Sequence, residues 1–239
     1  MNSIKIQSGA TKMVAHRGLS GIELENTNAS FIAAGNRSYY GIETDVHKTS
    51  DGKFVVFHDD NTGRLCDTNL SVEGTPFETL RGLTLTDREG HKDRADAVIP
   101  TLREYIRTCK RYEKIAVLEL KNAFEKEEIR AICDEITEED YLANVIFISF
   151  SFENLVFIRE FYPAHPVQFL TEKYDEELLI RLPAHGFDID IEYTELTEER
   201  VKAFHEKGIS INCWTCDDKA FAQDLVKWGV DMLTTNILE

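Results

Sequence analysis

Ile115-Ala116-Val117-Leu118-Glu119-Leu120 opens the part of the sequence that decides the fold. An amphipathic stretch over residues 126–137 follows this apolar run, and apolar and amphipathic segments then alternate as far as residue 233. Such alternation is typical of βα units, in which a helix connects each strand to a parallel neighbour. The sequence therefore predicts an α/β protein with a parallel sheet.

The same alternation extends toward the N-terminus and predicts eight main strands and one additional short strand, 54–57. The predicted strands are residues 13–15, 41–46, 54–57, 115–120, 145–148, 167–170, 187–191, 209–212 and 230–233. The predicted helices are residues 28–38, 101–111, 126–137, 152–161, 175–182, 197–207 and 218–228. Eight parallel strands in 239 residues favour a closed (β/α)8 TIM barrel, which typically has about 250 residues. An open doubly wound sheet is the alternative, although no Gly-rich phosphate loop follows the first strand.

The second predicted strand is expected to continue into a β-hairpin. Asp51-Gly52 separates it from the apolar run 54–57, and Asp-Gly between two strand-like runs is a strong hairpin signal. A two-residue turn at this point would place His58 opposite Asp45 across the antiparallel pair. Residues 59–99 are less periodic and rich in Thr, Gly and Asp, which indicates an inserted excursion over the C-terminal face. We expect residues 1–239 to form one domain.

The composition restricts the partners of the protein. A net charge of −16 disfavours nucleic acid and anionic membrane surfaces, because both bind basic surfaces. Residues 1–11 are polar and do not resemble a signal peptide. No apolar run approaches the ~18 residues of a membrane-spanning helix. We therefore expect a cytoplasmic protein with no integral membrane segment.

The five cysteines are odd in number and irregular in spacing, so they indicate no disulfide framework. Cys213 and Cys216 form a Cys-x-x-Cys pair, but no second pair completes a zinc site. A thioredoxin-like motif would lie near the first βα turn, whereas this pair lies near the C-terminus. We do not assign it a redox or metal-binding function.

Charged side chains end several of the predicted strands. In a (β/α)8 barrel the active site lies at the carboxyl ends of the strands, so these side chains are expected to converge on one rim. They are His16, Arg17, Glu43, Asp45, His58, Glu119 and Lys121. Any one of them alone is more often an exposed or structural residue. Carboxylates inside apolar strands are costly unless they are paired or bind a metal, so several at different strand ends predict a functional site.

The same residues carry a resemblance to a known family. Val14-Ala15-His16-Arg17-Gly18, Glu25-Asn26-Thr27, Glu43-Thr44-Asp45-Val46 and His58-Asp59 resemble the glycerophosphodiester phosphodiesterase family in order and spacing. Ile99-Pro100-Thr101-Leu102, Leu118-Glu119-Leu120-Lys121 and Trp214-Thr215 resemble its later motifs. The resemblance spans about residues 13–236, and the first 60 residues are its specific part. Thr234-Thr235-Asn236 departs from the pattern, because the family often has Thr-Asp there, and we assign nothing catalytic to it.

The resemblance implies a barrel enzyme that hydrolyses glycerophosphodiesters to glycerol 3-phosphate and an alcohol. It implies that Glu43, Asp45 and Glu119 hold one divalent cation, and all-carboxylate ligation suits Mg2+ or Ca2+. The other implied roles are acid and base for His16 and His58, and phosphate binding for Arg17 and Lys121. Trp214 is assigned to the glycerol site, although a core position at a strand end is an equal alternative for it.

Two other functions stay open. A lysophospholipase D-type barrel phosphodiesterase would need an apolar cleft or a membrane-contacting loop, and residues 59–99 are too polar to indicate one. A catalytically inactive barrel that binds a phosphorylated ligand would not need both histidines and all three acids. The expected partner is a small-molecule glycerophosphodiester, and the sequence indicates neither its head group nor an oligomeric state.

Overall fold

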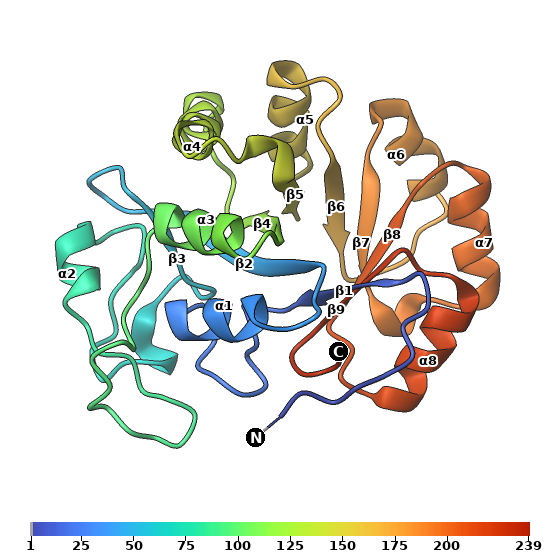
Figure 1. Cartoon of the computed structure of the whole chain (residues 1–239). Helices are drawn as coiled ribbons and strands as arrows, with labels where there is room; N and C mark the ends of the chain where they lie inside the picture. The colour runs from blue at the N-terminus through green and yellow to red at the C-terminus, as the bar shows by residue number, and fades with distance from the viewer. Residues whose placement is uncertain (1) are drawn as a thin grey trace.

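Eight parallel strands form a closed barrel in the computed structural model, which describes residues 2–239 (Figure 1). β1 (Lys12–Ala15) pairs with both β2 and β9, and this closes the sheet. The remaining strands are β2 (Gly41–Lys48), β3 (Phe54–Val56), β4 (Ile115–Leu120), β5 (Val145–Ser149), β6 (Val167–Thr171), β7 (Asp188–Glu192), β8 (Ile211–Trp214) and β9 (Met232–Thr235). The predicted (β/α)8 TIM barrel is therefore confirmed.

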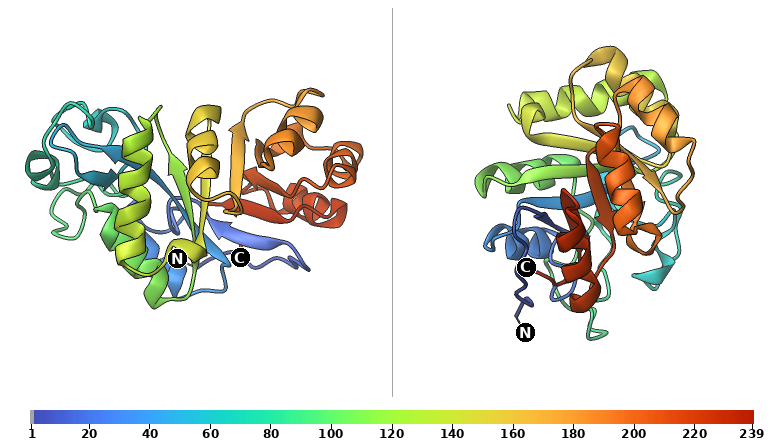
Figure 2. Two further views of the ribbon diagram at one scale, coloured as in Figure 1. Left: turned by 90° about the horizontal axis from the view of Figure 1, so that it is seen from above. Right: turned by 90° about the vertical axis from the view of Figure 1, so that its right-hand side faces the viewer.

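Helices surround the barrel (Figures 1 and 2). They are α1 (Asn28–Gly35), α2 (Phe77–Arg81), α3 (Leu102–Arg111), α4 (Lys126–Glu138), α5 (Phe152–Phe161), α6 (Leu178–His185), α7 (Glu198–Glu206) and α8 (Lys219–Trp228). α3 begins where Thr101 and Glu104 form a capping box, which satisfies backbone N–H groups of the first turn. The predicted bounds of 115–120 and 152–161 agree with the structure. α2 was not predicted, and β8 begins and ends two residues later than predicted.

Alternate residues of each strand face different surroundings. On β4, Leu118 points outward and packs in the main hydrophobic cluster between strands and helices. Val117 points inward, into a smaller apolar cluster that includes Val14 and Ile146. Glu119 lies on the same inward face as Val117, two residues nearer the carboxyl end. The barrel interior thus changes from apolar to charged toward the end where the site lies.

The hairpin between β2 and β3 is present, but its predicted register is wrong by one residue. Lys48 pairs with Phe54, whereas a two-residue turn would have paired it with the next residue along. The Asp45 carbonyl oxygen consequently accepts a hydrogen bond from the Phe57 amide. His58 is therefore not opposite Asp45 across the antiparallel pair. It nevertheless lines a cavity that Glu43 and Glu119 also line.

The turn itself explains this register. The Asp51 carboxylate accepts hydrogen bonds from the Thr49 hydroxyl group and from the Phe77 amide, at 2.6 and 2.9 Å. Gly52 takes a φ of 76°, in the left-handed region that glycine tolerates. The Asp51 side chain thus favours a three-residue turn that is also attached to α2, over the tighter turn that Asp-Gly alone predicts.

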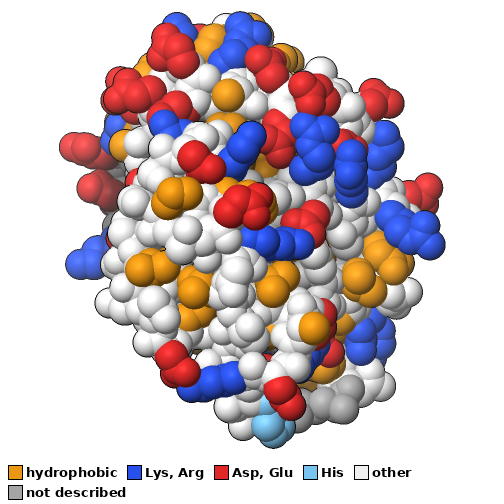
Figure 3. Space-filling view, turned by 90° about the vertical axis from the view of Figure 1, so that its left-hand side faces the viewer, with side chains coloured by type: hydrophobic (Ala, Val, Ile, Leu, Met, Phe, Trp, Pro, Cys, Tyr) orange, Lys and Arg blue, Asp and Glu red, His pale blue; other side chains and the backbone are white. Residues whose placement is uncertain are grey.

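The excursion (residues 59–99) lies beside the loops that follow β1 and β2, at the left of Figure 1. Its apolar residues form a second hydrophobic cluster with Phe57 and Leu24, distinct from the main one. Acidic and basic side chains are interspersed over this side of the molecule, as Figure 3 shows. Glu73 of the excursion contacts His47 near the end of β2, at 3.2 Å. These contacts attach the excursion to the rim of the barrel.

The two ends of the described chain lie close together (Figure 1). Ile4 forms a parallel bridge with Leu238. The Glu239 side chain accepts a hydrogen bond from the Ser38 amide and pairs with Lys5. Among residues 2–239, no helix is both long and apolar enough to cross a membrane.

Candidate active site

A cavity of about 290 Å³ opens at the carboxyl ends of the barrel strands. Its polar side includes six of the seven charged residues that the sequence singles out, namely His16, Arg17, Glu43, His58, Glu119 and Lys121. The seventh, Asp45, lies directly beneath them and is fully buried. The predicted convergence of these residues on one rim is therefore what the structure shows.

Three carboxylates meet at the centre of the site. Asp45 and Glu119 are register partners on neighbouring strands, and Glu43 lies on the same face of β2 as Asp45 because side chains alternate. Oxygen atoms of the three groups lie within 4.8 Å of one another, and all three residues are buried.

The three carboxyl groups differ in their proton affinity. Burial and the negative charge of Asp45 raise the pKa of Glu119 to about 8. Burial and the charges of Asp45 and Glu119 also raise the pKa of Glu43. Burial opposes ionisation of Asp45 as well, but Lys121, Arg17 and His58 outweigh it and hold the pKa of Asp45 well below its usual range.

Two cationic side chains adjoin the carboxylates. Lys121 Nζ lies 3.4 Å from Asp45 Oδ1 and 3.3 Å from Glu119 Oε1. Arg17 Nη1 donates to Glu25 Oε1 at 2.8 Å. Its buried Nε lies 3.8 Å from Asp45 Oδ2 but donates no hydrogen bond to the described residues. An unpaired buried N–H beside the cavity favours an incoming anionic oxygen as its partner.

His16 and His58 both line the cavity. His16 Nδ1 lies 2.8 Å from Asn236 Oδ1, and its Nε2 lies 4.0 Å from Glu43 Oε2. Burial, then the Arg17 charge, lowers the pKa of His16 to about 4. His58 Nδ1 lies 2.6 Å from Asp59 Oδ1, and burial also lowers the pKa of His58. The pKa values of both rings therefore lie below the ordinary value, and in each ring Nδ1 lies within hydrogen-bond distance of a side-chain oxygen.

Residues around the site fix the orientation of its charged groups. Asn26 donates to Asp45 Oδ2 at 2.7 Å and accepts from the Thr44 hydroxyl group. Glu25 accepts hydrogen bonds from both Arg17 and Arg64. Arg64 also donates to the Asp59 carboxylate, so a chain of ion pairs connects the two sides of the cavity.

The opposite wall of the cavity is apolar and aromatic. Ile148, Leu170, Phe150 and Trp214 line it. The Phe150 and Trp214 rings meet edge to face at 5.8 Å, and Phe150 is 42% exposed. Trp214 Nε1 donates to the Asp190 carbonyl oxygen at 3.3 Å, which fixes the indole at the cavity wall. Trp214 is thus a cavity residue and only partly buried.

The site fits a divalent cation. Glu119 Oε1 is buried and accepts no hydrogen bond from the described residues, although Lys121 is within ion-pair distance. Burial, followed by repulsion between the carboxylates, raises the pKa values of Glu43 and Glu119. Three buried carboxyl groups whose oxygen atoms converge form the hard-oxygen donor set that Mg2+ and Ca2+ prefer.

Sequence reasoning missed several residues of the site. Asn26 and Glu25 belong to a motif of the resemblance, but no role was inferred for them. Asp190 is a buried carboxyl group whose Oδ1 lacks a partner in residues 2–239, and it lines the cavity. Its position inside the apolar strand 187–191 is the same signal that identified Glu43 and Glu119, so it could have been found. Asn236 gave no such signal.

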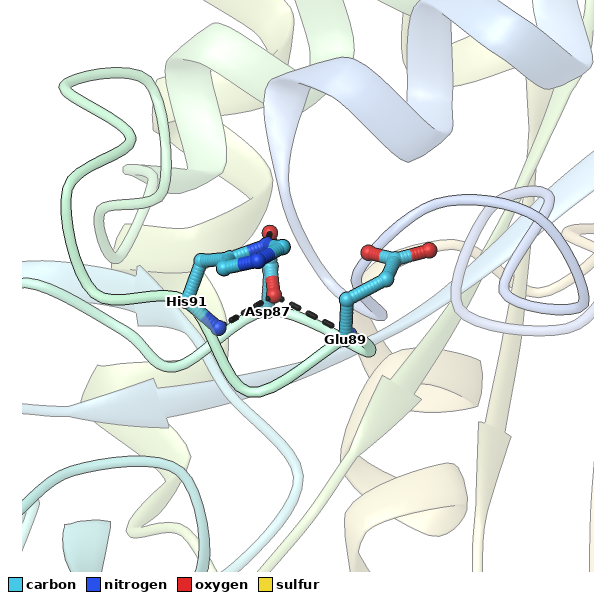
Figure 4. Close-up of side chains that lie close together, drawn as sticks. All are labelled: Asp87, Glu89 and His91. Atoms are coloured by element: carbon cyan, nitrogen blue, oxygen red, sulfur yellow. Dashed lines mark hydrogen bonds and ion pairs between the residues drawn. The ribbon is translucent and has the colours of Figure 1, made fainter.

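A second group of potential ligands, Asp87, Glu89 and His91, lies in the excursion (Figure 4). Asp87 Oδ1 accepts hydrogen bonds from the Glu89 and His91 amides, at 3.0 and 2.8 Å. The carboxylate thereby closes a turn, as aspartate side chains commonly do. This turn accounts for the proximity of the three residues, and we assign no ion to it.

Replacement of Asp87 by Ala should lower the melting temperature by only a few degrees and leave cation stoichiometry and kcat unchanged. The physical reason is that only the Glu89 and His91 amides lose a partner, the Asp87 carboxylate oxygen that accepts from both. Thermal unfolding and metal analysis would check this. Asp87→Asn is the control, because its side-chain oxygen still accepts. Loss of one bound ion in Asp87→Ala would show that the turn does hold a cation.

Fold and site together define a (β/α)8 barrel with a candidate active site at the carboxyl ends of its strands. The chain belongs to the glycerophosphoryl diester phosphodiesterase family, whose model matches residues 16–239. The Bacillus subtilis protein YhdW is 30% identical over 232 residues, which cover 94% of this chain and 93% of that protein. A glycerophosphodiester phosphodiesterase of Caldanaerobacter subterraneus is 28% identical, covering 95% of this chain and 94% of the relative.

A solved structure supports the same relationship. The Oleispira antarctica phosphodiesterase, determined in complex with the product sn-glycerol-3-phosphate, is 27% identical. It superimposes with a TM-score of 0.87, covering 94% of this chain and 92% of its own. The resemblance inferred from the sequence motifs is therefore confirmed.

Proposed function

We propose that the protein hydrolyses glycerophosphodiesters to glycerol 3-phosphate and an alcohol, with one divalent cation and two histidines. The observation that carries this proposal is the meeting of buried carboxylates, two imidazoles and two cationic side chains in one cavity. A phosphodiester is anionic and its leaving alkoxide is strongly basic, so cleavage needs both positive charge and proton transfer. Family membership and the product bound by the Oleispira relative support this substrate.

Glu43, Asp45 and Glu119 would hold the cation, Mg2+ or Ca2+. When bound, such an ion neutralises phosphate oxygens and polarises the phosphoryl group. Arg17 and Lys121 would bind the remaining phosphate oxygens, since both adjoin the carboxylates and face the cavity.

His16 and His58 would carry the two proton transfers. In the first step one imidazole Nε2 takes the proton of the glycerol 2-hydroxyl group while that oxygen attacks phosphorus. The other ring, in its protonated form, donates to the head-group oxygen as the P–O bond breaks, which gives a cyclic phosphate and the free alcohol. In the second step the two imidazoles exchange their roles: one takes a proton from the water that attacks phosphorus, and the other donates a proton to the glycerol 2-oxygen. The cyclic phosphate then opens to glycerol 3-phosphate.

A panel assay tests the function. Choline, ethanolamine, glycerol and inositol diesters and a lysolipid would be supplied with Mg2+ or Ca2+, and with chelator. We expect release of glycerol 3-phosphate that chelator abolishes and added cation restores. Turnover of no substrate would favour the inactive phospho-ligand-binding barrel. Undiminished turnover in chelator would remove the cation from the proposal.

Cation binding should expel protons between about pH 4.5 and 8. The pKa of Glu119 is raised to about 8 from an ordinary value of 4.5, so over this window the carboxyl group is protonated until a cation displaces the proton. The apparent affinity for Mg2+ or Ca2+ should therefore rise with pH and level off above about pH 8. Calorimetry in two buffers of different ionisation enthalpy measures the released protons. Glu119→Gln should release fewer, whereas equal release would show that Glu119 is not a ligand.

The apolar wall favours one second candidate. Phe150, Trp214, Ile148 and Leu170 provide the apolar cleft that a lysophospholipase D-type activity requires. Hydrolysis of the lysolipid in the panel faster than of the diesters would favour this function. Phe150→Ser should then reduce lysolipid turnover selectively, because it removes apolar contact without touching the charged side of the cavity.

A further inference from the structure

We propose that Asn236 and Asp217 form a positioning pair that fixes the ring orientation and tautomer of His16, with the Nε2 lone pair toward the cavity. The proposal rests on the acid–base role of His16 in the proposed function. It adds two residues to the site: Asp217, which belongs to none of the sequence motifs, and Asn236, where the chain departs from the family pattern.

The pair sits behind His16, on the side away from the substrate cavity. Asn236 follows β9 and Asp217 follows β8, and these strands are neighbours in the barrel. Asn236 Nδ2 donates to Asp217 Oδ2 at 2.6 Å, and the Asn236 backbone amide donates to Asp217 Oδ1 at 2.8 Å. The Thr235 hydroxyl group donates to the same Oδ1 at 2.8 Å. Three donors thus converge on one carboxylate.

This carboxylate decides which way the Asn236 amide points. An ionised carboxylate accepts hydrogen bonds and donates none, so the NH2 end of Asn236 must face Asp217. The carbonyl oxygen of the side chain then faces His16 Nδ1 at 2.8 Å and the Ser20 hydroxyl group at 2.6 Å. An oxygen acceptor at this place requires that Nδ1 carries the ring proton.

The tautomer determines what His16 can do in the cavity. With the proton on Nδ1, a neutral ring has its lone pair on Nε2, as a general base requires. Nε2 lies on the cavity side, 3.5 Å from the Thr215 hydroxyl oxygen and 4.0 Å from Glu43 Oε2. A flipped Asn236 amide would present its NH2 group to Nδ1 and favour the opposite tautomer, whose Nε2 cannot accept a proton.

The two histidines are held by acceptors of different charge. His58 Nδ1 contacts the Asp59 carboxylate directly, at 2.6 Å. His16 instead contacts a neutral amide, and the charge of Asp217 lies one hydrogen bond further away. The pair therefore orients His16 through a neutral amide. No further carboxylate is placed against the ring, which already lies beside Glu43 of the three-carboxylate cluster.

Four variants measure the contribution of the pair to turnover. Asn236→Ala removes the acceptor and should lower kcat by about 10–100-fold, the usual effect of losing an orienting partner, with little change in KM. Asp217→Asn removes the group that enforces the amide orientation and should lower kcat by a smaller factor. The double variant Asn236→Asp with Asp217→Asn exchanges the two side chains. The carboxylate at position 236 then accepts from His16, the amide at position 217 donates to that carboxylate, and most of kcat should be recovered. Asp224→Asn is the control, since it makes the same charge change on an exposed face of α8.

Nitrogen-15 NMR of histidine-labelled protein, loaded with Mg2+, tests the tautomer without relying on activity. The His16 signals are assigned by their absence from His16→Gln. We expect a protonated Nδ1 and an unprotonated Nε2 in the wild-type protein, and loss of this preference in Asn236→Ala. Retention of the same tautomer in Asn236→Ala, or a protonated Nε2 in the wild-type protein, would overturn the proposal.

The two tests separate this proposal from the function on which it rests. If no diester is hydrolysed but the tautomer depends on Asn236, the positioning role stands and the proposed function fails. If diesters are hydrolysed and Asn236→Ala keeps wild-type kcat, the positioning role fails and the function stands. If Asn236→Ala does not fold, Asp217→Asn takes its place in both tests, because that variant retains Asn236 and its backbone.

Discussion

A glycerophosphodiester that lacks the 2-hydroxyl group should bind as a competitive inhibitor and turn over at least about 10³-fold more slowly than the natural diester. The reason is the tethering of the nucleophile, which provides effective molarities of up to about 10⁵–10⁸ M in well-oriented cases. One carboxylate cluster fits one cation in the cavity, so no second ion there would position a hydroxide opposite the leaving group. The internal hydroxyl group fills that role in the proposed mechanism.

The measurement is the kcat of the 2-deoxy analogue, with its inhibition constant determined against the natural substrate. A five-membered cyclic phosphate should be hydrolysed by the same protein, and phosphorus NMR during turnover would detect it if it accumulates. Glycerophosphodiesters with and without the hydroxyl group that turn over within a few-fold of each other would show direct attack by water. The two-step mechanism would then be wrong, while hydrolysis itself would stand.

His58→Ala should lower kcat by about 10²–10⁴-fold, the usual contribution of one acid–base group, and His16→Ala should fall in the same range. Affinity for Mg2+ or Ca2+ should change little, because neither imidazole belongs to the three-carboxylate cluster. Glu43→Ala and Glu119→Ala should behave differently from the histidine variants, because each should lower both cation affinity and turnover. Excess cation should partly restore the turnover.

His91→Ala provides the matched control for the histidine variants, because the His91 side chain is 66% exposed and lies in the excursion. Isothermal titration with the cation and steady-state kinetics on the same preparations separate the two roles. Wild-type turnover in His16→Ala would end its assignment as an acid or base. A large loss of cation affinity in His58→Ala would make that residue a ligand.

The sequence predicted the barrel because its parallel strands are buried on both faces and read as continuous apolar runs. β4 agrees with its predicted bounds because polar residues flank it, and α5 does so because the Ser151 N-cap begins it and Pro163 follows its end. The excursion was less predictable, since its short helix α2 depends on tertiary contacts such as the hydrogen bond from Phe77 to Asp51.

The site was predictable where a residue type is costly in its surroundings. Glu43, Asp45 and Glu119 stand out as carboxylates in apolar strands, and the structure brings them together. Asn236 is uncharged and follows a strand end, where asparagine is common, so its contact with His16 could not be inferred from its residue type. The hairpin register was wrong for a related reason: Asp-Gly predicts a turn, but the side-chain acceptor of Asp51 decides its length.

The pairing of β1 with β9 has a consequence for synthesis on the ribosome. Lys12 pairs with Met232, so the first and last barrel strands are made on the order of ten to forty seconds apart at typical rates of roughly 5–20 residues per second. Until β9 emerges, one edge of β1 has no neighbouring strand and its backbone groups are unpaired there. A nascent chain of this fold therefore presents an open sheet edge for most of its translation, and such an edge is where chaperones bind and where neighbouring nascent chains would pair.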